Sequence, residues 1–593
     1  MKRVILFFAL ALSGLGLANA QWSDDPAENL QLNNESFYSF ETELLSDGSW
    51  YLYHNRPDGS IDTIVPYLQR YDKDGNAMWA EPLEISRNVT MSWTKVMDYM
   101  TIDQDDNAII VTQDLRHGPE SYTAYKVSPD GEFLWPEGGV DLYNGNYPSG
   151  CAALNMTQIA DGSYIFAWLE YTNDDANTGV IRMQRVSAEG EILWGEGKLL
   201  QEENTPMTYP YVLDAGNNEF LLVYAYGASQ QLQVRKMDFD GNDVWAQPTT
   251  AFDAVSSSIP LWTFLEVIPA DGGVLIATYE GDPNFPYIAY VKNDGTHAFA
   301  EGSAGLRLGY SEWLAWGIKL VFDEENQAIY ATWRESDYNQ QYYQIVTQKV
   351  SLDGELLWDP NGIAITPFLP RPVSYYDAEL GPKGSLFVTF MEQYDVDGNG
   401  LGSNDPVNVL ASLQDADGSF MWADTTVTVS NHVGVKYSTE SLPLSNDQWI
   451  VVWEDCRADS IVHGDSVLYV ESRVDGGWIY GQSIGMDGNL GGGMANETNE
   501  ESLASNRVSV FQIYPNPVRE SATLVIENGS NPVQISIELL DIRGTAITKV
   551  YDGTLPSGKT EIGWTRPAGL AQGLYIMRCV IGRQVYYIKV MLQ

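Results

Sequence analysis

The sequence is short of cysteine, histidine and basic residues, and each shortage excludes a class of protein. Three cysteines, Cys151, Cys456 and Cys579, are too few for a disulfide scaffold, although one bridge between the first two stays open. The chain has no CxxC pair, and its five histidines are scattered without an HExxH motif, so no zinc site can be assigned. A GxSxG elbow is also missing. The sequence therefore identifies no catalytic residue and no cofactor-binding residue.

Positive charge is scarce as well. Lysine and arginine number 33 against 80 aspartates and glutamates, which gives a formal net charge of -47. A surface this negative repels nucleic acid and anionic lipid, so we expect neither as a partner. The simplest interpretation is a well-solvated exported protein, with a divalent cation or a cationic partner as the alternative. Carboxylates are so numerous that a glycosidase-like pair cannot be picked out.

Long apolar runs are confined to the first twenty residues. Lys2 and Arg3 precede an apolar stretch over residues 4–17, and Ala18-Asn19-Ala20 then supplies the small residues of a cleavage site. This pattern predicts a signal peptide over residues 1–20. The apolar stretch is too short to span a membrane, and Gln21 would begin the mature chain, where a lipoprotein has cysteine. No other run approaches eighteen apolar residues, so no integral membrane segment is expected.

Helical periodicity is missing too, and in its place one short phrase recurs. It consists of a basic residue, an apolar residue, two variable residues, Asp-Gly or Glu-Gly, three further residues and an aromatic residue. The glycines of this phrase recur about every 57 residues. Full copies cover 70–79, 126–135, 185–194, 236–245 and 349–358, weaker copies cover 291–299 and 413–422, and an eroded eighth copy begins at Met486.

A second phrase precedes each of these copies: a polar turn and then a nearly continuous apolar run, as in DGSYIFAW from Asp161. Such runs predict strands that are buried on both faces. The strand before each Asp-Gly is more polar, which predicts a position nearer the sheet edge. The Asp-Gly pair itself predicts a hairpin turn with positive φ at the glycine. Each repeat is thus a small antiparallel sheet that must stack on its neighbours.

Repeats of this length, with several strands and a periodic tryptophan, predict an all-β fold with a β-propeller over residues 21–492. Counting the buried strands favours eight blades, with seven as the alternative. The eighth unit has no strand after Gly488, so we expect an early strand near Ser36–Glu43 to complete the last blade. The periodic tryptophan is expected to pack between neighbouring blades. These repeats resemble those of bacterial β-propellers with a DG-x3-W phrase and, in architecture only, the tryptophan-docking repeats of quinoprotein-like propellers.

A polar linker over residues 493–507 is expected to follow the propeller. The remaining residues, 508–593, contain seven short apolar segments separated by turns, which predict a small β-sandwich. These segments cover 509–514, 522–527, 533–541, 546–551, 560–564, 573–581 and 584–592.

This last module resembles the type A C-terminal sorting domain of type IX secretion. It opens with Tyr514-Pro515-Asn516-Pro517, continues with an ELLDIRG turn at 538–544 and a GLYI phrase at 573–576, and closes with YIKV at 587–590. The resemblance implies transport by Sec to the periplasm and by a type IX translocon across the outer membrane. A sortase would then cleave the module during surface attachment or release. The protein is thus expected to be secreted or attached to the outer-membrane surface.

One loop has the oxygen spacing of a calcium site. Asp395, Asp397 and Asn399 occupy positions 1, 3 and 5 of a calcium-binding loop, and Gly400 occupies position 6. Position 12 is Pro406, where such a loop carries a bidentate glutamate. A hairpin tip between two blade strands is the simpler interpretation. Calcium therefore stays an open candidate, and no other cofactor is indicated.

Aromatic residues gather in the connections of the later repeats. They are Tyr310, Trp313 and Trp316; Tyr338, Tyr342 and Tyr343, beside Arg334 and Glu335; and Tyr375 and Tyr376. Aromatic residues on loops over a rigid scaffold favour protein or carbohydrate binding, although packing between blades would explain most of them.

Two functional hypotheses follow. The first is a binding or scaffold propeller at the cell surface, with an unknown protein or carbohydrate ligand. It is favoured because no catalytic motif is found. The alternative is a surface hydrolase that acts on polysaccharide at the propeller channel. Carboxylates or arginines that converge at the channel mouth would favour the hydrolase.

Overall fold

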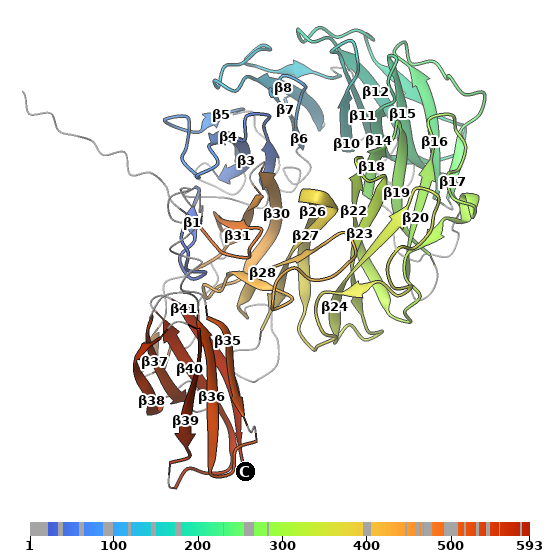
Figure 1. Cartoon of the computed structure of the whole chain (residues 1–593). Coiled ribbons are helices and arrows are strands. Elements are labelled where there is room, and N and C mark those ends of the chain that lie inside the picture. Colours follow the sequence, from blue (N-terminus) through green and yellow to red (C-terminus); the bar gives the residue numbers. More distant parts are fainter. Residues whose placement is uncertain are drawn as a thin grey trace, which may run out of the picture. The chain divides into compact units, whose positions relative to one another are not determined.

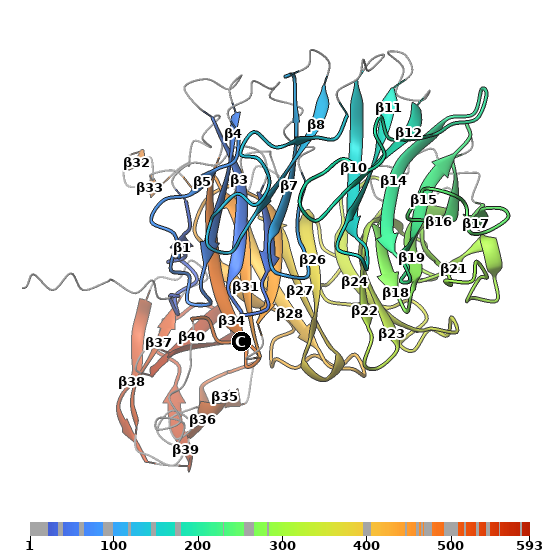
Figure 2. The same ribbon diagram turned by 90° about the horizontal axis from the view of Figure 1, so that it is seen from above.

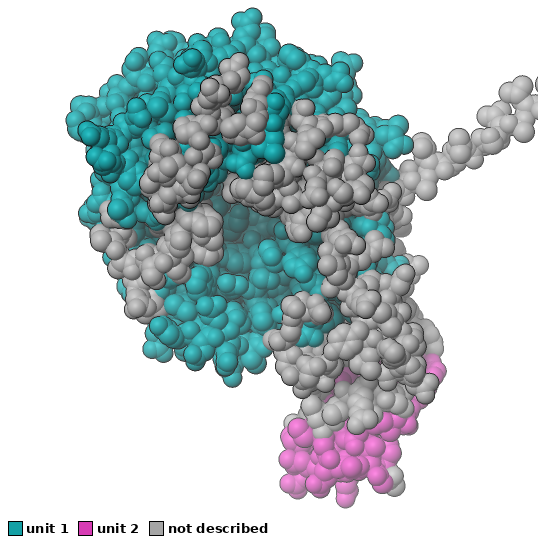
Figure 3. Space-filling view, turned by 180° about the vertical axis from the view of Figure 1, so that it is seen from behind, with its two compact units in different colours: residues 1–492 teal, residues 493–593 magenta. Residues whose placement is uncertain are grey.

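The computed structural model divides into two compact units, residues 1–492 and 493–593 (Figure 3). In the first unit the structure describes 22–33, 40–57, 64–86, 99–116, 120–143, 150–171, 179–228, 230–253, 266–280, 284–394, 405–444, 447–457, 462–463, 466–467 and 477–491. In the second unit it describes 508–514, 517–528, 533–540, 546–556, 558–567, 569–581 and 584–593. The expected signal peptide, the expected linker and the candidate calcium ligands Asp395, Asp397 and Asn399 lie outside the described residues.

The first unit contains eight four-stranded antiparallel sheets that follow one another around a common centre (Figures 1 and 2). Blade 1 contains β2 (Phe40–Leu44), β3 (Trp50–Pro57), β4 (Ile64–Tyr71) and β5 (Leu83–Glu84). Blade 2 contains β6 (Tyr99–Ile102), β7 (Ala108–Asp114), β8 (Ser121–Val127) and β9 (Val140–Asp141). Blade 3 contains β10 (Cys151–Gln158), β11 (Tyr164–Tyr171), β12 (Gly179–Val186) and β13 (Lys198–Leu200). Blade 4 contains β14 (Met207–Asp214), β15 (Glu219–Tyr226), β16 (Gln231–Asp238) and β17 (Thr249–Phe252).

The remaining blades repeat this order. Blade 5 contains β18 (Glu266–Ala270), β19 (Gly273–Glu280), β20 (Phe285–Val291) and β21 (Leu306–Arg307). Blade 6 contains β22 (Leu314–Asp323), β23 (Ala328–Ser336), β24 (Tyr343–Ser351) and β25 (Ile363–Ala364). Blade 7 contains β26 (Val373–Gly381), β27 (Ser385–Gln393), β28 (Val407–Gln414) and β29 (Val427–Ser430). Blade 8 contains β30 (Lys436–Leu444), β31 (Gln448–Asp455), β34 (Trp478–Gly485) and β1 (Leu30–Gln31). Short elements complete the unit: η4 (Gly302–Ala304), η5 (Pro382–Gly384), and a hairpin of β32 (Val462–His463) and β33 (Ser466–Val467).

The second strand of each blade is the most apolar, as predicted, and it buries both of its faces. In β31 every residue is buried, and in β19 every residue but the last. Two buried faces require a neighbour on each side, and eight apolar clusters supply them, one between each pair of consecutive blades. One of these clusters joins Ile450 and Val452 of blade 8 to Trp50 and Leu52 of blade 1. The first unit is therefore a closed eight-bladed propeller.

The periodic tryptophans pack between blades, and each packs onto the Asp-Gly turn of the next blade. The Trp79 indole lies over Gly131, and its Nε1 donates to the Pro129 carbonyl oxygen at 3.1 Å. Equivalent bonds run from Trp135 to Ala188 (3.0 Å), from Trp194 to Phe239 (3.2 Å) and from Trp422 to Met486 (3.0 Å). The turn glycines have the predicted positive φ, for example 80° at Gly131. A side chain there would therefore be strained and would also meet the indole.

The basic residue of the repeat stabilises the same turn. The Arg70 guanidinium pairs with Asp47 of its own blade at 2.6 Å and donates to the Pro129 carbonyl oxygen of blade 2 at 3.0 Å. Lys349 likewise reaches the Ala416 carbonyl oxygen of the next blade at 3.0 Å. Lys126 pairs with buried Asp103 at 2.9 Å. Arg70 and Lys349 thus bind neighbouring blades together.

Ring closure differs from the sequence-based prediction. The last blade is completed by β1, whose Leu30 and Gln31 pair with Gly481 and Tyr480 of β34. The predicted closing strand, Ser36–Glu43, is wrong: its described end belongs to β2, the innermost strand of blade 1. The N-terminal segment also supplies the indole that the eroded eighth repeat lacks. Trp22 lies over Gly75 of blade 1 and donates to the Lys73 carbonyl oxygen at 3.0 Å.

The second unit is a small sandwich whose strands match the prediction closely. One sheet has the order β35 (Val508–Tyr514), β36 (Ser521–Asn528), β39 (Gly558–Thr565). The other has the order β38 (Ala546–Leu555), β37 (Val533–Leu540), β40 (Gly573–Ile581), β41 (Gln584–Leu592). A single apolar core draws side chains from both sheets, including Leu524 and Trp564 of the first and Ile537 and Met577 of the second.

Candidate functional site

The two ends of the blades differ in what they carry. Because the strands are antiparallel, the turns after the first and third strands of every blade lie at one end. The loops after the second strands and the connections between blades lie at the other. We call these ends the turn face and the loop face. The turn face contains the docked indoles and the ion pairs described above, which have a structural role. The candidate ligand-binding residues therefore lie on the loop face and in the channel.

Five aromatic side chains lie in three connections of the loop face, and three of them are in contact. Tyr310 and Trp313 precede β22, Tyr338 and Tyr342 lie in the β23–β24 loop, and Phe368 precedes β26. Phe368 packs against Trp313 and Tyr342, with ring centroids 4.7 and 5.9 Å apart and nearly parallel planes. Tyr338 is 72% exposed, Tyr310 58% and Tyr342 43%. We call these five residues the aromatic platform.

Polar groups hold in place the connection before β22, which carries Tyr310 and Trp313. The Arg307 guanidinium stacks on Phe285, lies 5.1 Å from the Tyr310 ring and donates to the carbonyl oxygens of Gly309 (2.6 Å) and Ser311 (3.1 Å). The Glu335 carboxylate is buried and accepts from the Ser311 hydroxyl at 2.5 Å. It also accepts hydrogen bonds from Trp333 Nε1 at 3.2 Å and from Gln344 Nε2 at 2.7 Å. Both carboxylate oxygens of Glu335 are therefore already hydrogen-bonded. This connection is fixed before any ligand arrives.

The β23–β24 loop, which carries Tyr338 and Tyr342, is a compact turn held by the side chain of Asp337. The Asp337 carboxylate accepts from the backbone N–H groups of Gln341 (2.5 Å) and Tyr342 (2.8 Å). These bonds hold the pKa of Asp337 below its usual range. Gln340 has a φ of 52°, which lets the chain reverse here. The turn presents Tyr338 at its tip, with the amides of Asn339 and Gln341 exposed beside it.

Sequence reasoning found four of the five platform residues. It missed Phe368, which has no aromatic neighbour in sequence and joins the others only through the fold. It also included Trp316 and Tyr376, which lie in inner strands: Trp316 Nε1 donates to Ser336, and the Tyr376 hydroxyl donates to the Trp316 carbonyl oxygen at 2.5 Å. Tyr375 packs edge-to-face on Tyr437 of blade 8 instead, with centroids 6.2 Å apart.

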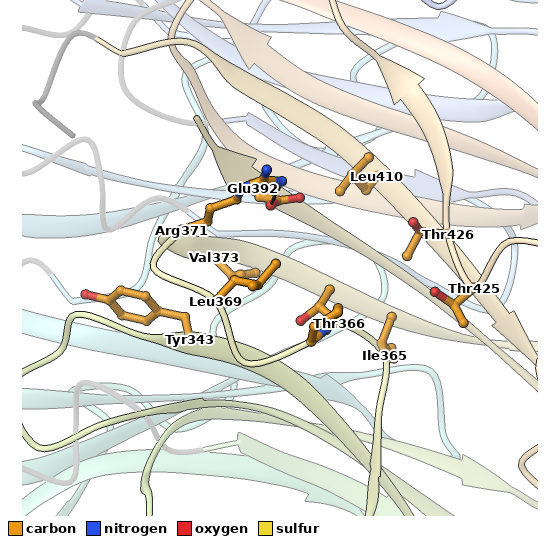
Figure 4. Close-up of a pocket in the computed structure, with 11 residues that line it drawn as sticks. Tyr343, Ile365, Thr366, Leu369, Arg371, Val373, Glu392, Leu410, Thr425 and Thr426 are labelled. Carbon is orange, nitrogen blue, oxygen red and sulfur yellow. Dashed lines mark hydrogen bonds and ion pairs between the residues drawn. The ribbon is translucent and has the colours of Figure 1, made fainter. Parts of the chain in front are cut away.

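A small cleft lies beside the platform between blades 6 and 7 (Figure 4). Its volume is about 120 Å³, and Tyr343, Leu369, Val373 and Leu410 are among its apolar walls. Arg371 and Glu392 lie side by side at its edge and form an ion pair of 2.9 Å (Figure 4). Sites for drug-sized ligands are several times larger, so this cleft could take only part of a ligand that lies mainly elsewhere.

The channel is lined by the innermost strand of each blade, and each such strand has one unpaired edge. Side chains of the preceding blade cap the exposed N–H groups of that edge. Glu41 accepts from Met100 at 2.5 Å, Asn155 from Val212 at 2.8 Å, Asp377 from Ser441 at 2.8 Å and Glu440 from Thr42 at 2.7 Å. These polar residues therefore bind neighbouring blades together at the centre of the propeller.

Among the described residues of the inner strands, acidic side chains of blades 1, 5, 7 and 8 lie close enough to Lys319 of blade 6 or to one another for their charges to interact. Burial raises the pKa of Glu43 to about 7 and that of Glu440 to about 8. Burial and the charge of Asp377 raise the pKa of Glu379 well above its usual range, and no described residue donates a hydrogen bond to it. The central cation is Lys319, 3.8 Å from Glu266, whose charge raises its pKa. These channel carboxyls therefore keep their protons to a higher pH than exposed glutamates do.

Metal ligation has no support in the described part of the chain. There, no three histidine, cysteine or acidic side chains gather closely enough to hold an ion. The calcium prediction at 395–399 lies outside the described residues and stays a prediction. Cys151 and Cys456, both described and buried, form no disulfide with each other. Within the described ranges, no helix has the length and apolar character needed to cross a bilayer.

The fold thus defines a propeller joined to a C-terminal β-sandwich, and comparison with known families identifies the sandwich. Residues 512–593 match the secretion system C-terminal sorting domain. This part of the chain is therefore a type IX sorting domain, and the protein is exported by type IX secretion to the cell surface or the medium.

Solved structures of similar fold include a protein of unknown function from Dyadobacter fermentans DSM 18053 (11% identity, 55% of this chain, 99% of that chain, TM-score 0.33). The Dos1 propeller (10% identity, 72% and 92% coverage, TM-score 0.36) and the polysaccharide lyase Uly1 (12%, 74% and 88%, 0.37) are also similar. These TM-scores are all below 0.5, so the likenesses say nothing about function, and the propeller is defined by its own eight sheets. No curated protein matches the sequence.

Proposed function

We propose that the propeller is a non-enzymatic binding module, delivered outside the cell by its sorting domain, and that it binds its ligand on the aromatic platform. The observation that supports this most strongly is the preformed stack of Trp313, Phe368 and Tyr342, which come from three separate connections. Rings that only filled the space between blades would be buried. Tyr310 and Tyr338, by contrast, keep more than half of their surface exposed.

The route of export supports a role in binding outside the cell. Sec would take the chain to the periplasm, the translocon would recognise the sorting domain, and a sortase would cleave it. The propeller would then remain as an acidic, well-solvated body that carries the aromatic platform. A rigid scaffold that presents aromatic side chains on its loops is a common arrangement in binding proteins.

The test is a binding screen with the purified secreted protein, with and without calcium, against glycans and against surface proteins of the producing cell. We expect a ligand whose binding is lost in the double variant Tyr338→Ala, Tyr342→Ala. The matched control is Leu357→Ala, which removes a side chain that is 48% exposed on the turn face. A ligand that binds both variants equally well would contradict the assignment of the platform.

A surface polysaccharide hydrolase with its site in the channel is the second candidate. The observation that favours it is the group of channel carboxyls with raised pKa values, because a carboxyl kept protonated near neutral pH can act as a general acid. It ranks second because Glu41, Asp377 and Glu440 already cap strand edges and Glu266 is paired with Lys319. Release of reducing ends from a polysaccharide by the wild-type protein, abolished in Glu379→Gln, would establish it.

A further inference from the structure

We propose that the ligand of the aromatic platform is an uncharged polysaccharide chain; this inference rests on the binding function proposed above. The choice among ligand classes follows from three properties of the platform: its exposed area, its polar rim and its charge.

The exposed tyrosine area alone is well below that of a standard protein interface. Tyr310, Tyr338 and Tyr342 expose 58%, 72% and 43% of their surfaces. With about 200 Å² for a whole aromatic side chain, this amounts to about 350 Å² of tyrosine surface. A standard protein interface buries about 800 Å² on each partner. A patch of a few hundred Å² instead matches a few sugar rings, whose apolar C–H faces pack on aromatic rings.

The rim of the platform supplies the hydrogen bonds that sugar hydroxyls require. The amides of Asn339 and Gln341 are exposed on the turn that presents Tyr338. Glu312 is exposed between Tyr310 and Trp313. Amides and carboxylates accept bonds from hydroxyl groups, and amides also donate them. The aromatic rings can thus pack against the apolar faces of sugar rings, while the surrounding amides and carboxylate form hydrogen bonds with the sugar hydroxyl groups.

The charge around the platform disfavours an anionic chain. The formal net charge of the whole protein is -47, which repels uronic acids, sulfates and phosphates at long range. The cations near the platform are already engaged. Arg307 donates to two backbone carbonyl oxygens, and Arg371, although 54% exposed, is paired with Glu392. Among the described residues, Glu392 therefore offsets the charge of the one half-exposed cation beside the platform, which weakens its attraction for an anionic polysaccharide. An uncharged chain needs no such attraction.

The experiment compares soluble uncharged polysaccharides (a β-glucan, a xylan and a mannan) with anionic ones (alginate and polygalacturonate) by affinity electrophoresis and titration calorimetry of the secreted protein. We expect at least one uncharged chain to bind, with affinity that changes less than twofold between low and high salt. Tyr338→Ala and Tyr342→Ala should each weaken it about tenfold, and Leu357→Ala should leave it unchanged. Thermal melts of the variants show that each is folded.

The outcomes separate this inference from the function on which it rests. Binding of anionic chains only, or binding that collapses with salt, would overturn the inference about ligand class. A protein partner whose binding depends on Tyr338 and Tyr342 would also overturn it, while the platform would stand as the binding site. If no ligand of either class is affected by Tyr338→Ala or Tyr342→Ala, both the inference and the proposed function fall.

Discussion

Replacing Trp22 by alanine tests how the propeller ring is closed. Trp22 is 3% exposed, lies over Gly75 of blade 1 and donates to the Lys73 carbonyl oxygen at 3.0 Å. Removing a buried tryptophan costs about 3–5 kcal/mol, and the hydrogen bond contributes about 1 kcal/mol of that loss. We therefore expect Trp22→Ala to lower the free energy of unfolding by about 3–5 kcal/mol.

The matched control is Trp135→Ala, which removes an indole of the same burial at the equivalent position between blades 2 and 3. Blades 2 and 3 are joined directly by the chain, whereas blades 8 and 1 are held by the N-terminal segment, where β1 contributes only two paired residues. Both variants should be destabilised in urea unfolding. In hydrogen exchange, only Trp22→Ala should lose protection selectively in β1, β34 and β3.

Two results would refute this reasoning. The first is a Trp22→Ala protein within about 1 kcal/mol of the wild type, since a buried tryptophan that closes the ring cannot cost so little. The second is unchanged exchange protection in β34 and β3, which would mean that the ring closes without the docked indole.

Three further predictions follow from the same structure. Because the pKa values of Glu43 and Glu440 are raised from 4.5 to about 7 and about 8, the folded protein binds more protons than the unfolded chain in that range, so stability should fall as pH rises from about 4.5 to about 8. Glu440→Gln should flatten this fall in thermal melts; an unchanged profile would contradict the raised pKa. Arg70→Ala should lower the free energy of unfolding by about 1–2 kcal/mol in urea titrations, because the Pro129 carbonyl oxygen loses its donor. The loss stays this small because the ion-pair partner, Asp47, is partly exposed to water. A change below about 0.5 kcal/mol would argue against this role of Arg70. A chain that ends at Asn506 should accumulate in the periplasm by cell fractionation, whereas its normal export would remove the role of the sorting domain.

The propeller could be predicted from the sequence because its repeating contacts are local. The Asp-Gly turn, its aromatic residue and the buried second strand all fall within one repeat, so each copy reports the same structure. The closing strand could not be found in this way. Leu30 and Gln31 form only two residues of strand in a polar segment, and their partners lie about 450 residues away. The indole that replaces the missing eighth one, Trp22, lies outside every repeat.

The candidate site was only partly predictable for a related reason. Tyr338 and Tyr342 are close in sequence and lie on one turn, so their clustering is visible in the sequence. Phe368 joins them only because consecutive blades bring two connections together. The channel carboxyls are hidden among 80 acidic residues. What distinguishes Glu379 and Glu440 is their place on the inner strands of two neighbouring blades, β26 and β30.

The closed ring can be tested most directly by a cross-link between its two ends. Gln31 of β1 and Tyr480 of β34 are directly paired antiparallel residues, and such pairs have the Cα separation that a disulfide needs. If the N-terminal segment completes blade 8, the double variant Gln31→Cys, Tyr480→Cys should form this disulfide in the folded protein under mild oxidation, as mapped by peptide mass spectrometry. A protein that stays reduced while folded, and forms the cross-link only after unfolding, would show that the ring is not closed in this way.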